Sequence, residues 1–88
     1  MKSAYTDQYG VLLTIMIAAR KDLGLTQQQL ATLLQKPQSY VSKYERAERR
    51  LDVIEFLAIS KVLKLDPCSV LRKVDSASAK APVRRGGA

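Results

Sequence analysis

The stretch Leu25-Thr-Gln-Gln-Gln-Leu-Ala31, followed after six residues by Gln38-Ser-Tyr-Val-Ser-Lys-Tyr-Glu45, decides how this chain folds. Both stretches are amphipathic and begin with helix-start signals. Thr26 and Gln29 form a Thr-x-x-Gln capping box, in which each side chain bonds the other residue's backbone N–H. Pro37 is expected to end the first helix and to occupy the first position of the second, because a proline disfavours helical backbone in the residue before it. The pattern predicts two short helices joined by a tight turn.

The rest of the chain predicts three further helices and no strand. One helix is expected over residues 8–23, stopped by Gly24, and the second stretch should be helical over residues 38–46. Asp52-x-x-Glu55 marks the start of a fourth helix, and Asp66-Pro67 precedes a short fifth. The side chains expected to face the core are Leu12, Met16, Ala19, Leu23, Leu30, Ala31, Leu34, Val41, Tyr44, Phe56, Ile59, Ser60, Leu63, Val70, Leu71 and Val74. The predicted fold class is all-α, a compact five-helix domain.

The composition changes at Asp75, where Ser, Ala, Lys, Pro, Arg and Gly replace core-forming residues. Such a segment cannot bury enough apolar surface to offset the entropy of ordering it. We therefore expect one domain over residues 1–74 and a flexible basic tail over residues 75–88. For the tail residues Arg84 and Arg85, a solubilising role is favoured over a specific contact.

Composition excludes several classes of protein. The 88 residues suffice for one domain, and the net charge of +7 with a pI of about 9.9 favours a polyanionic partner. A single cysteine, Cys68, excludes an intramolecular disulfide. With no histidine and one cysteine, neither a zinc ligand set nor His-based catalysis is expected. The sequence predicts a protein that is not an enzyme and uses no cofactor or metal.

The apolar run Val11–Ala19 raises the question of a membrane or secretory segment. Nine residues cannot cross a bilayer, which takes about 20. A secretory leader is disfavoured because Tyr5, Asp7 and Tyr9 make a poor charged leader and cleavage would remove the first helix. We expect a buried first helix, no membrane association and a cytoplasmic protein.

The spacing of the two central helices indicates a double-stranded DNA partner. Ala31 is small enough to let two helices approach closely, and Val41 would fill the same junction from the second helix. That helix, about 13 Å long over nine residues, can enter the major groove of DNA. Its outward face would carry Gln, Ser and Lys side chains, which can hydrogen-bond base edges. These residues are Gln38, Ser39, Ser42, Lys43 and, at its end, Arg46.

Residues 12–72 resemble the Cro-type helix-turn-helix family, which includes DNA-binding domains similar to phage lambda repressor and the xenobiotic-response-element regulators. The resemblance rests on elements found in the family's order: Gly24-Leu-Thr-Gln27, Gln29-Leu-Ala31, Gln38-Ser-Tyr-Val-Ser-Lys-Tyr-Glu45, Arg49-Arg-Leu-Asp52 and Leu65-Asp-Pro67. The implied fold is lambda-repressor-like, with the helix-turn-helix at the second and third helices.

The resemblance also implies roles for individual residues. Gln38, Ser39, Ser42 and Lys43 match family positions that touch bases, and Gln27 matches a glutamine that bonds a phosphate. An Arg20–Glu45 salt bridge is expected to tie the first helix to the third. Residues 36–50 hold five Lys or Arg against two Glu, net +3. Phosphate contacts are therefore also expected from Lys36, Arg46, Arg49 and Arg50.

Two positions depart from the family pattern. Gln35 and Ala47 stand where the family usually has glycine, at sites that often take left-handed backbone. That conformation costs a non-glycine residue on the order of 1 kcal/mol. Either the chain bears this strain, or the third helix runs on past Ala47.

These features favour a sequence-specific transcriptional regulator of the repressor type, acting as a homodimer on double-stranded DNA. The alternatives are an antitoxin-type protein that neutralises a protein partner and autoregulates through DNA, and a protein-binding module. Leu13, Ile15 and Ile17 give the first helix more apolar surface than one stripe requires. This surface would either pack against the last helix and the N-terminal tyrosines, or form a homodimer interface involving the first or fifth helix.

Overall fold

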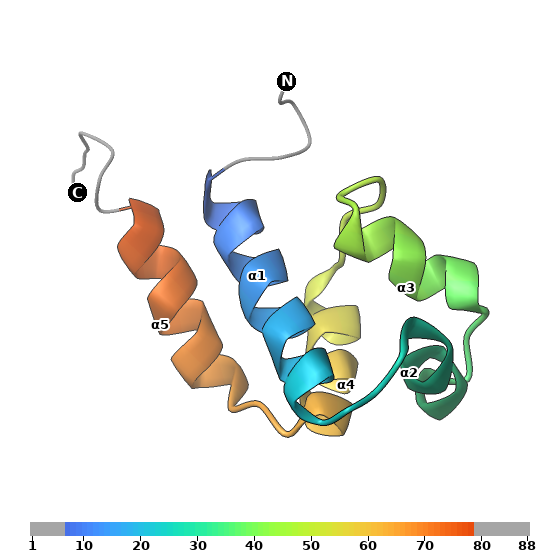
Figure 1. Ribbon diagram of the computed structural model, residues 1–88. Coiled ribbons are helices and arrows are strands. Elements are labelled where there is room, and N and C mark those ends of the chain that lie inside the picture. Colours follow the sequence, from blue (N-terminus) through green and yellow to red (C-terminus); the bar gives the residue numbers. More distant parts are fainter. Residues whose placement is uncertain (1–6, 79–88) are drawn as a thin grey trace.

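The computed structural model describes residues 7–78, which form five α-helices and no strand (Figure 1). The predicted fold class is confirmed. The helices, in chain order, are α1 (Asp7–Asp22), α2 (Gln27–Leu34), α3 (Gln38–Glu45), α4 (Val53–Leu63) and α5 (Pro67–Ser78). No helix in this range is long and apolar enough to cross a membrane.

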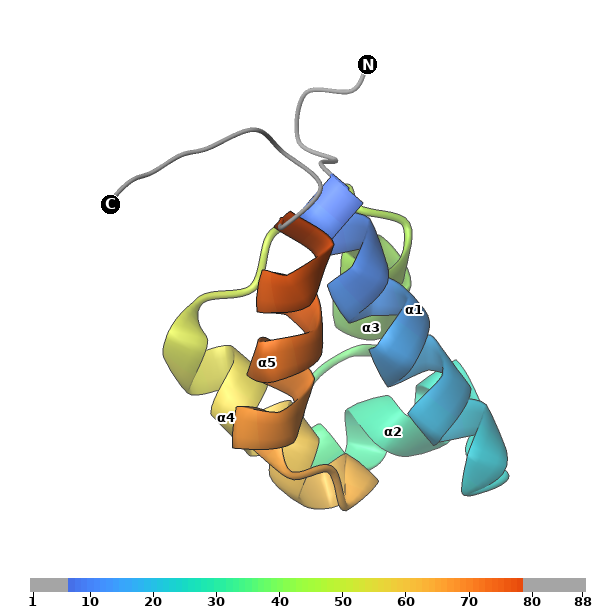
Figure 2. The same ribbon diagram turned by 90° about the vertical axis from the view of Figure 1, so that its left-hand side faces the viewer.

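The helices enclose one core between two helix pairs. α1 and α5 lie side by side and run in opposite directions (Figures 1 and 2), while α2 and α3 pack together beyond α4. The core residues, all at most 6% exposed, are Tyr9, Leu13, Met16, Leu30, Ala31, Val41, Tyr44, Phe56, Ile59, Leu63 and Val70. α3 therefore rests on the core with one side and leaves the other side at the surface.

Both predicted capping boxes are present. Thr26 Oγ1 accepts from the Gln29 N–H at 3.0 Å, and Gln29 Oε1 accepts from the Thr26 N–H at 2.8 Å. Asp52 and Glu55 make the same reciprocal bonds at 2.8 and 2.9 Å. The expectation for Pro37 is wrong by one position. Its ψ of 156° is extended, so it precedes α3 as the N-cap instead of opening the helix.

The backbone is left-handed at both positions where the family that the chain resembles usually has glycine. Gln35 has φ 60° and Ala47 has φ 61°, and α3 ends at Glu45 instead of running on. The backbone N–H of Gln35 bonds back to carbonyls of α2, which is the ordinary purpose of a left-handed residue at a helix end. A third residue, Lys64, adopts the same conformation after α4, with φ 61°.

Replacing Lys64 with glycine is expected to raise the free energy of unfolding, by up to about 1 kcal/mol, because glycine pays no Cβ penalty at positive φ. Urea denaturation measures this change. Lys73→Gly is the matched control, since Lys73 is also exposed but lies inside α5, where glycine should destabilise by about 1 kcal/mol. Equal destabilisation by both substitutions would show that Lys64 carries no strain.

α5 differs from the sequence prediction in length and in its buried face. It continues to Ser78, so the expectation of a flexible tail beginning at Asp75 is wrong for the first residues of that segment, and residues 79–88 lie outside the described part of the chain. Val70 and Val74, one helical turn apart, face the core, and the Val74 carbonyl accepts from Gln8 Nε2 of α1 at 3.4 Å. Leu71 is 50% exposed because it falls beside that stripe.

Part of the apolar surplus of α1 packs within the chain. Leu13 is 3% exposed, and Ile15 and Ile17 are partly buried against the core. Packing within the chain therefore accounts for Leu13 and for the buried part of the two isoleucines. Leu23 was expected to be buried but is 41% exposed, because α1 ends at Asp22 and Leu23 belongs to the turn before Gly24.

Candidate nucleic-acid interface

The packing of α2 against α3 determines which face of α3 is exposed. Ala31 and Val41 are fully buried, as expected, and Tyr44 anchors the last turn of α3 with no exposed surface. Because Val41 and Tyr44 lie three residues apart on one face, the opposite face of α3 is left free. Figure 1 shows α3 at the edge of the molecule, with its neighbours on one side.

The free face of α3 carries the polar side chains expected there. Gln38, Ser39 and Lys43 are exposed, and Ser42 is half-buried. All four lie between the start of the helix and its last turn, and none of them forms an ion pair in the described structure. The face can therefore donate and accept hydrogen bonds to a ligand without first breaking a strong internal contact.

The Arg20–Glu45 ion pair expected from the resemblance is present. Arg20 Nε donates to Glu45 Oε2 at 2.7 Å and Nη2 donates to Oε1 at 3.1 Å, a bidentate arrangement. Both side chains are nearly buried, at 10% and 5% exposed. Arg20 Nη1 also donates to the Leu25 carbonyl at 2.8 Å, so one guanidinium joins α1, the α1–α2 loop and α3.

A chain of glutamines extends this pair to the tip of α3. Gln27 Nε2 donates to Glu45 Oε1 at 2.9 Å, and Gln38 Nε2 donates to Gln27 Oε1 at 3.2 Å. Glu45 at one end of α3 is thus linked through α2 to Gln38 at the other end. This link was not predicted from the sequence. The available signal was that Gln27 and Gln38 are the first residues of two helices that pack together.

Arg49, which follows α3, makes more contacts within the protein than the sequence indicated. Arg49 donates to both carboxylate oxygens of Glu55, at 3.0 and 2.6 Å, and its guanidinium lies over the Tyr40 ring at 4.8 Å. The hydrogen bonds from Arg49 lower the pKa of Glu55 to about 2, so this carboxylate remains charged in all but strongly acidic solution. Arg49 therefore ties the α3–α4 loop to α4 through Glu55.

The other basic residues near α3 make weaker contacts than the Arg49–Glu55 pair. Arg46 pairs with Glu48 at 3.0 Å, but both side chains are more than half exposed, so the pair is weak and can exchange for another anion. The Arg50 guanidinium lies over the Tyr9 ring at 4.6 Å, and the Lys36 ammonium lies 5.3 Å from the Tyr40 ring. Within residues 7–78, no group of three or more potential metal ligands exists.

α3 packs across α2, presents a polar face at the surface and is followed by basic residues. This arrangement is typical of helix-turn-helix domains, whose second helix enters a groove of DNA. The helix-turn-helix family model matches residues 16–69 of the chain. Among solved structures, an XRE-family like protein from Pseudomonas syringae pv. tomato str. DC3000 is similar, with a TM-score of 0.74 and 45% sequence identity over 85% of this chain and 88% of that one. A search of curated proteins found no match.

The chain belongs to the Cro-type helix-turn-helix (XRE) family. This family consists of DNA-binding proteins and not of enzymes. The resemblance inferred from the sequence and the lambda-repressor-like fold are confirmed. Membership implies that the chain binds DNA.

Proposed function

We propose that this protein is a sequence-specific repressor of transcription that reads the major groove of double-stranded DNA with α3. The observation that carries the proposal is the exposed polar face of α3. The opposite face of the same helix is fixed to the rest of the domain by buried Val41 and Tyr44 and by the Arg20–Glu45 pair. A reading element must be both exposed and fixed, because specificity depends on holding donors and acceptors against particular base edges.

Within this face we assign base contacts to Gln38, Ser39, Ser42 and Lys43. The Gln38 amide suits adenine and the Lys43 ammonium suits the guanine acceptors, whereas the serine hydroxyls can serve either base type. The bond from Gln38 to Gln27 presets the direction of the Gln38 amide before DNA arrives. Less side-chain entropy is then lost on binding.

We assign phosphate contacts to the residues around the reading helix. Gln27 lies at the first position of α2, where free backbone N–H groups favour an anion. Lys36 and Arg50 are exposed, and Arg46 can leave its exposed pair with Glu48. Arg49 would contribute only through the exposed part of its side chain, because both its terminal nitrogens already have partners.

Selection of binding sites from random duplexes, followed by a salt titration on the selected site, tests this function. The proposal predicts one enriched sequence and an affinity that falls with salt, with a log–log slope of about −4 for each bound copy if four or five phosphates are neutralised. Enrichment of no sequence would contradict specific reading. A slope near zero would contradict the assigned phosphate contacts.

We further propose that the protein acts on DNA as a homodimer. α3 has eight residues and so reaches only a few base pairs from one copy. Two copies related by a two-fold axis would read two half-sites about one helical turn apart, which doubles the contacts.

A further inference from the structure

The first turn of α1 is joined to the loop that follows α3. The Tyr9 hydroxyl donates to the Arg49 backbone carbonyl at 3.1 Å, although the two residues lie 40 positions apart in the chain. A second hydrogen bond joins the same hydroxyl to the Leu51 backbone. Figure 2 shows the start of α1 beside this loop. One hydroxyl therefore contacts the backbone on both sides of Arg50.

The ring of Tyr9 also contacts the side chain of Arg50. The Arg50 guanidinium lies over this ring, 4.6 Å from its centroid. Tyr9 is only 6% exposed and packs in the hydrophobic core, so its ring has a fixed position. Arg50 itself is exposed. One buried side chain thus orients both the backbone and the guanidinium of an arginine at the surface.

The contact with Tyr9 differs in kind from the contacts of the neighbouring arginine. Both terminal nitrogens of Arg49 donate to the Glu55 carboxylate, so this guanidinium is already paired with an anion. An aromatic face attracts a cation to its π electrons, and this contact uses none of the N–H groups in the plane of the guanidinium. Those N–H groups are the ones that bind a phosphate. The ring of Tyr9 therefore orients Arg50 and leaves it able to bind an anion.

The Tyr9 hydroxyl is a donor at neutral pH. Burial raises the pKa of Tyr9, whereas the hydrogen bond from the Leu51 backbone and the charges of Arg50 and Arg49 act in the opposite direction. The pKa lies above its ordinary value of 10.0, so the hydroxyl keeps its proton. The hydrogen bond to the Arg49 carbonyl is therefore present under the conditions in which DNA binding is measured.

We propose that Tyr9 is a positioning residue for DNA binding, which holds Arg50 in the orientation that binds a backbone phosphate. The inference rests on the proposed function, because it needs the phosphate contact assigned to Arg50. An arginine that is ordered before DNA arrives loses less side-chain entropy on binding. Tyr9 lies before residues 16–69, which match the family model, so this contribution comes from a part of α1 outside the matched segment.

Tyr9→Phe tests the proposal with the removal of one oxygen atom. The ring and its packing in the core remain, but the backbone around Arg50 loses its link to α1. The variant should bind the selected duplex about two- to tenfold more weakly, because the arginine and its loop must then be ordered on binding. Fluorescence anisotropy measures this change, and urea denaturation shows that the variant is folded.

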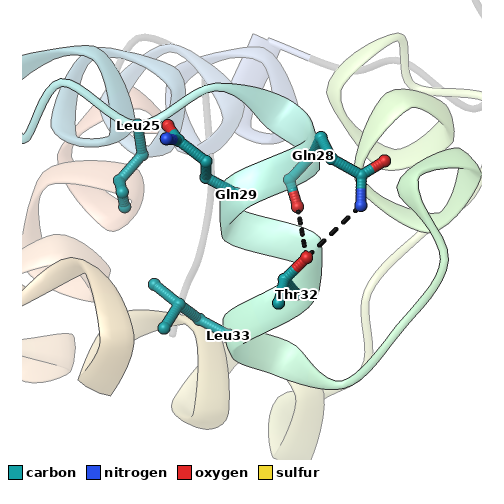
Figure 3. A pocket seen from close by; sticks show the side chains of 5 residues that line it. All are labelled: Leu25, Gln28, Gln29, Thr32 and Leu33. Atoms are coloured by element: carbon teal, nitrogen blue, oxygen red, sulfur yellow. Dashed lines mark hydrogen bonds between the residues drawn. The ribbon is translucent and has the colours of Figure 1, made fainter.

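Thr32→Val is the matched control. It also removes a hydroxyl that donates to a backbone carbonyl, here that of Gln28 at 3.0 Å (Figure 3). The two hydrogen bonds of the Thr32 hydroxyl both stay within α2. DNA affinity should therefore remain at the wild-type value. An equal loss of affinity in Thr32→Val and Tyr9→Phe would overturn the proposal.

Arg50→Ala distinguishes positioning from a general effect on the fold. This substitution should weaken DNA binding and make the log–log salt slope shallower by about 0.9, the value for one phosphate contact. In the Arg50→Ala background, Tyr9→Phe should cause no further loss of affinity. An equal loss in both backgrounds would overturn the proposal, because a purely structural role of Tyr9 does not depend on the Arg50 side chain.

The same measurements separate failure of this inference from failure of the proposed function. If Arg50→Ala weakened binding but Tyr9→Phe bound as tightly as the wild type, the positioning role alone would be wrong. If Arg50→Ala changed neither the affinity nor the salt slope, the phosphate contact assigned to Arg50 would be wrong, and the role of Tyr9 would be wrong with it.

Discussion

Glu45→Ala is expected to lower the free energy of unfolding by about 3–5 kcal/mol, because it leaves Arg20 charged, nearly buried and without its carboxylate. It should also weaken DNA binding strongly, although Glu45 makes no contact with DNA in this account. Gln27 loses its acceptor at the same time, so the link to Gln38 is released. Urea denaturation measures the first effect. Fluorescence anisotropy on the selected duplex, at a temperature where the variant is folded, measures the second.

Glu48→Ala is the control for this prediction. Glu48 is also a carboxylate paired with an arginine, but its side chain is 53% exposed, so its removal should cost less than about 1 kcal/mol. Because it frees Arg46, DNA affinity should hold or rise. If Glu45→Ala were as mild as Glu48→Ala, or left DNA affinity unchanged, the Arg20–Glu45 pair would not position the reading helix.

Ala31→Leu is expected to destabilise the protein by about 1–3 kcal/mol and to remove specific DNA binding. Ala31 has no exposed surface and lies where α2 packs on α3, so a larger side chain must push the helices apart. A displacement of α3 by about 1 Å is enough to misalign the hydrogen bonds that read base edges. Thermal denaturation and anisotropy measure the two effects.

Ala18→Leu makes the same chemical change on an exposed position of α1 and should alter neither stability nor binding appreciably. If Ala31→Leu kept full affinity for the selected site, the angle between α2 and α3 would not set specificity. If both variants lost affinity equally, the effect would not come from the helix junction.

Short-range signals in the sequence predicted much of the fold. The capping boxes at Thr26 and Asp52 depend on residues three apart, so local sequence fixes them. The burial of Ala31 and Val41 follows from helical spacing in the same way. The Arg20–Glu45 pair joins residues 25 apart in the chain and was predicted only through the family resemblance.

Features that depend on how distant elements pack could not be predicted. α5 continues to Ser78 because it lies along α1, although its sequence beyond Asp75 has little preference of its own. Arg49 turns towards Glu55 and Tyr40 because the α3–α4 loop folds back, which net charge cannot reveal. The sequence left two outcomes open at Ala47, a left-handed residue or a longer third helix, and only the structure decides for the left-handed backbone.

The most direct test of the central claim is to follow the backbone amide resonances of the protein while the selected duplex is added. The account predicts that the largest shifts fall on the face of α3 that carries Gln38, Ser39, Ser42 and Lys43, with smaller shifts at the start of α2. Large shifts on α4 or α5 with α3 unchanged would contradict the account.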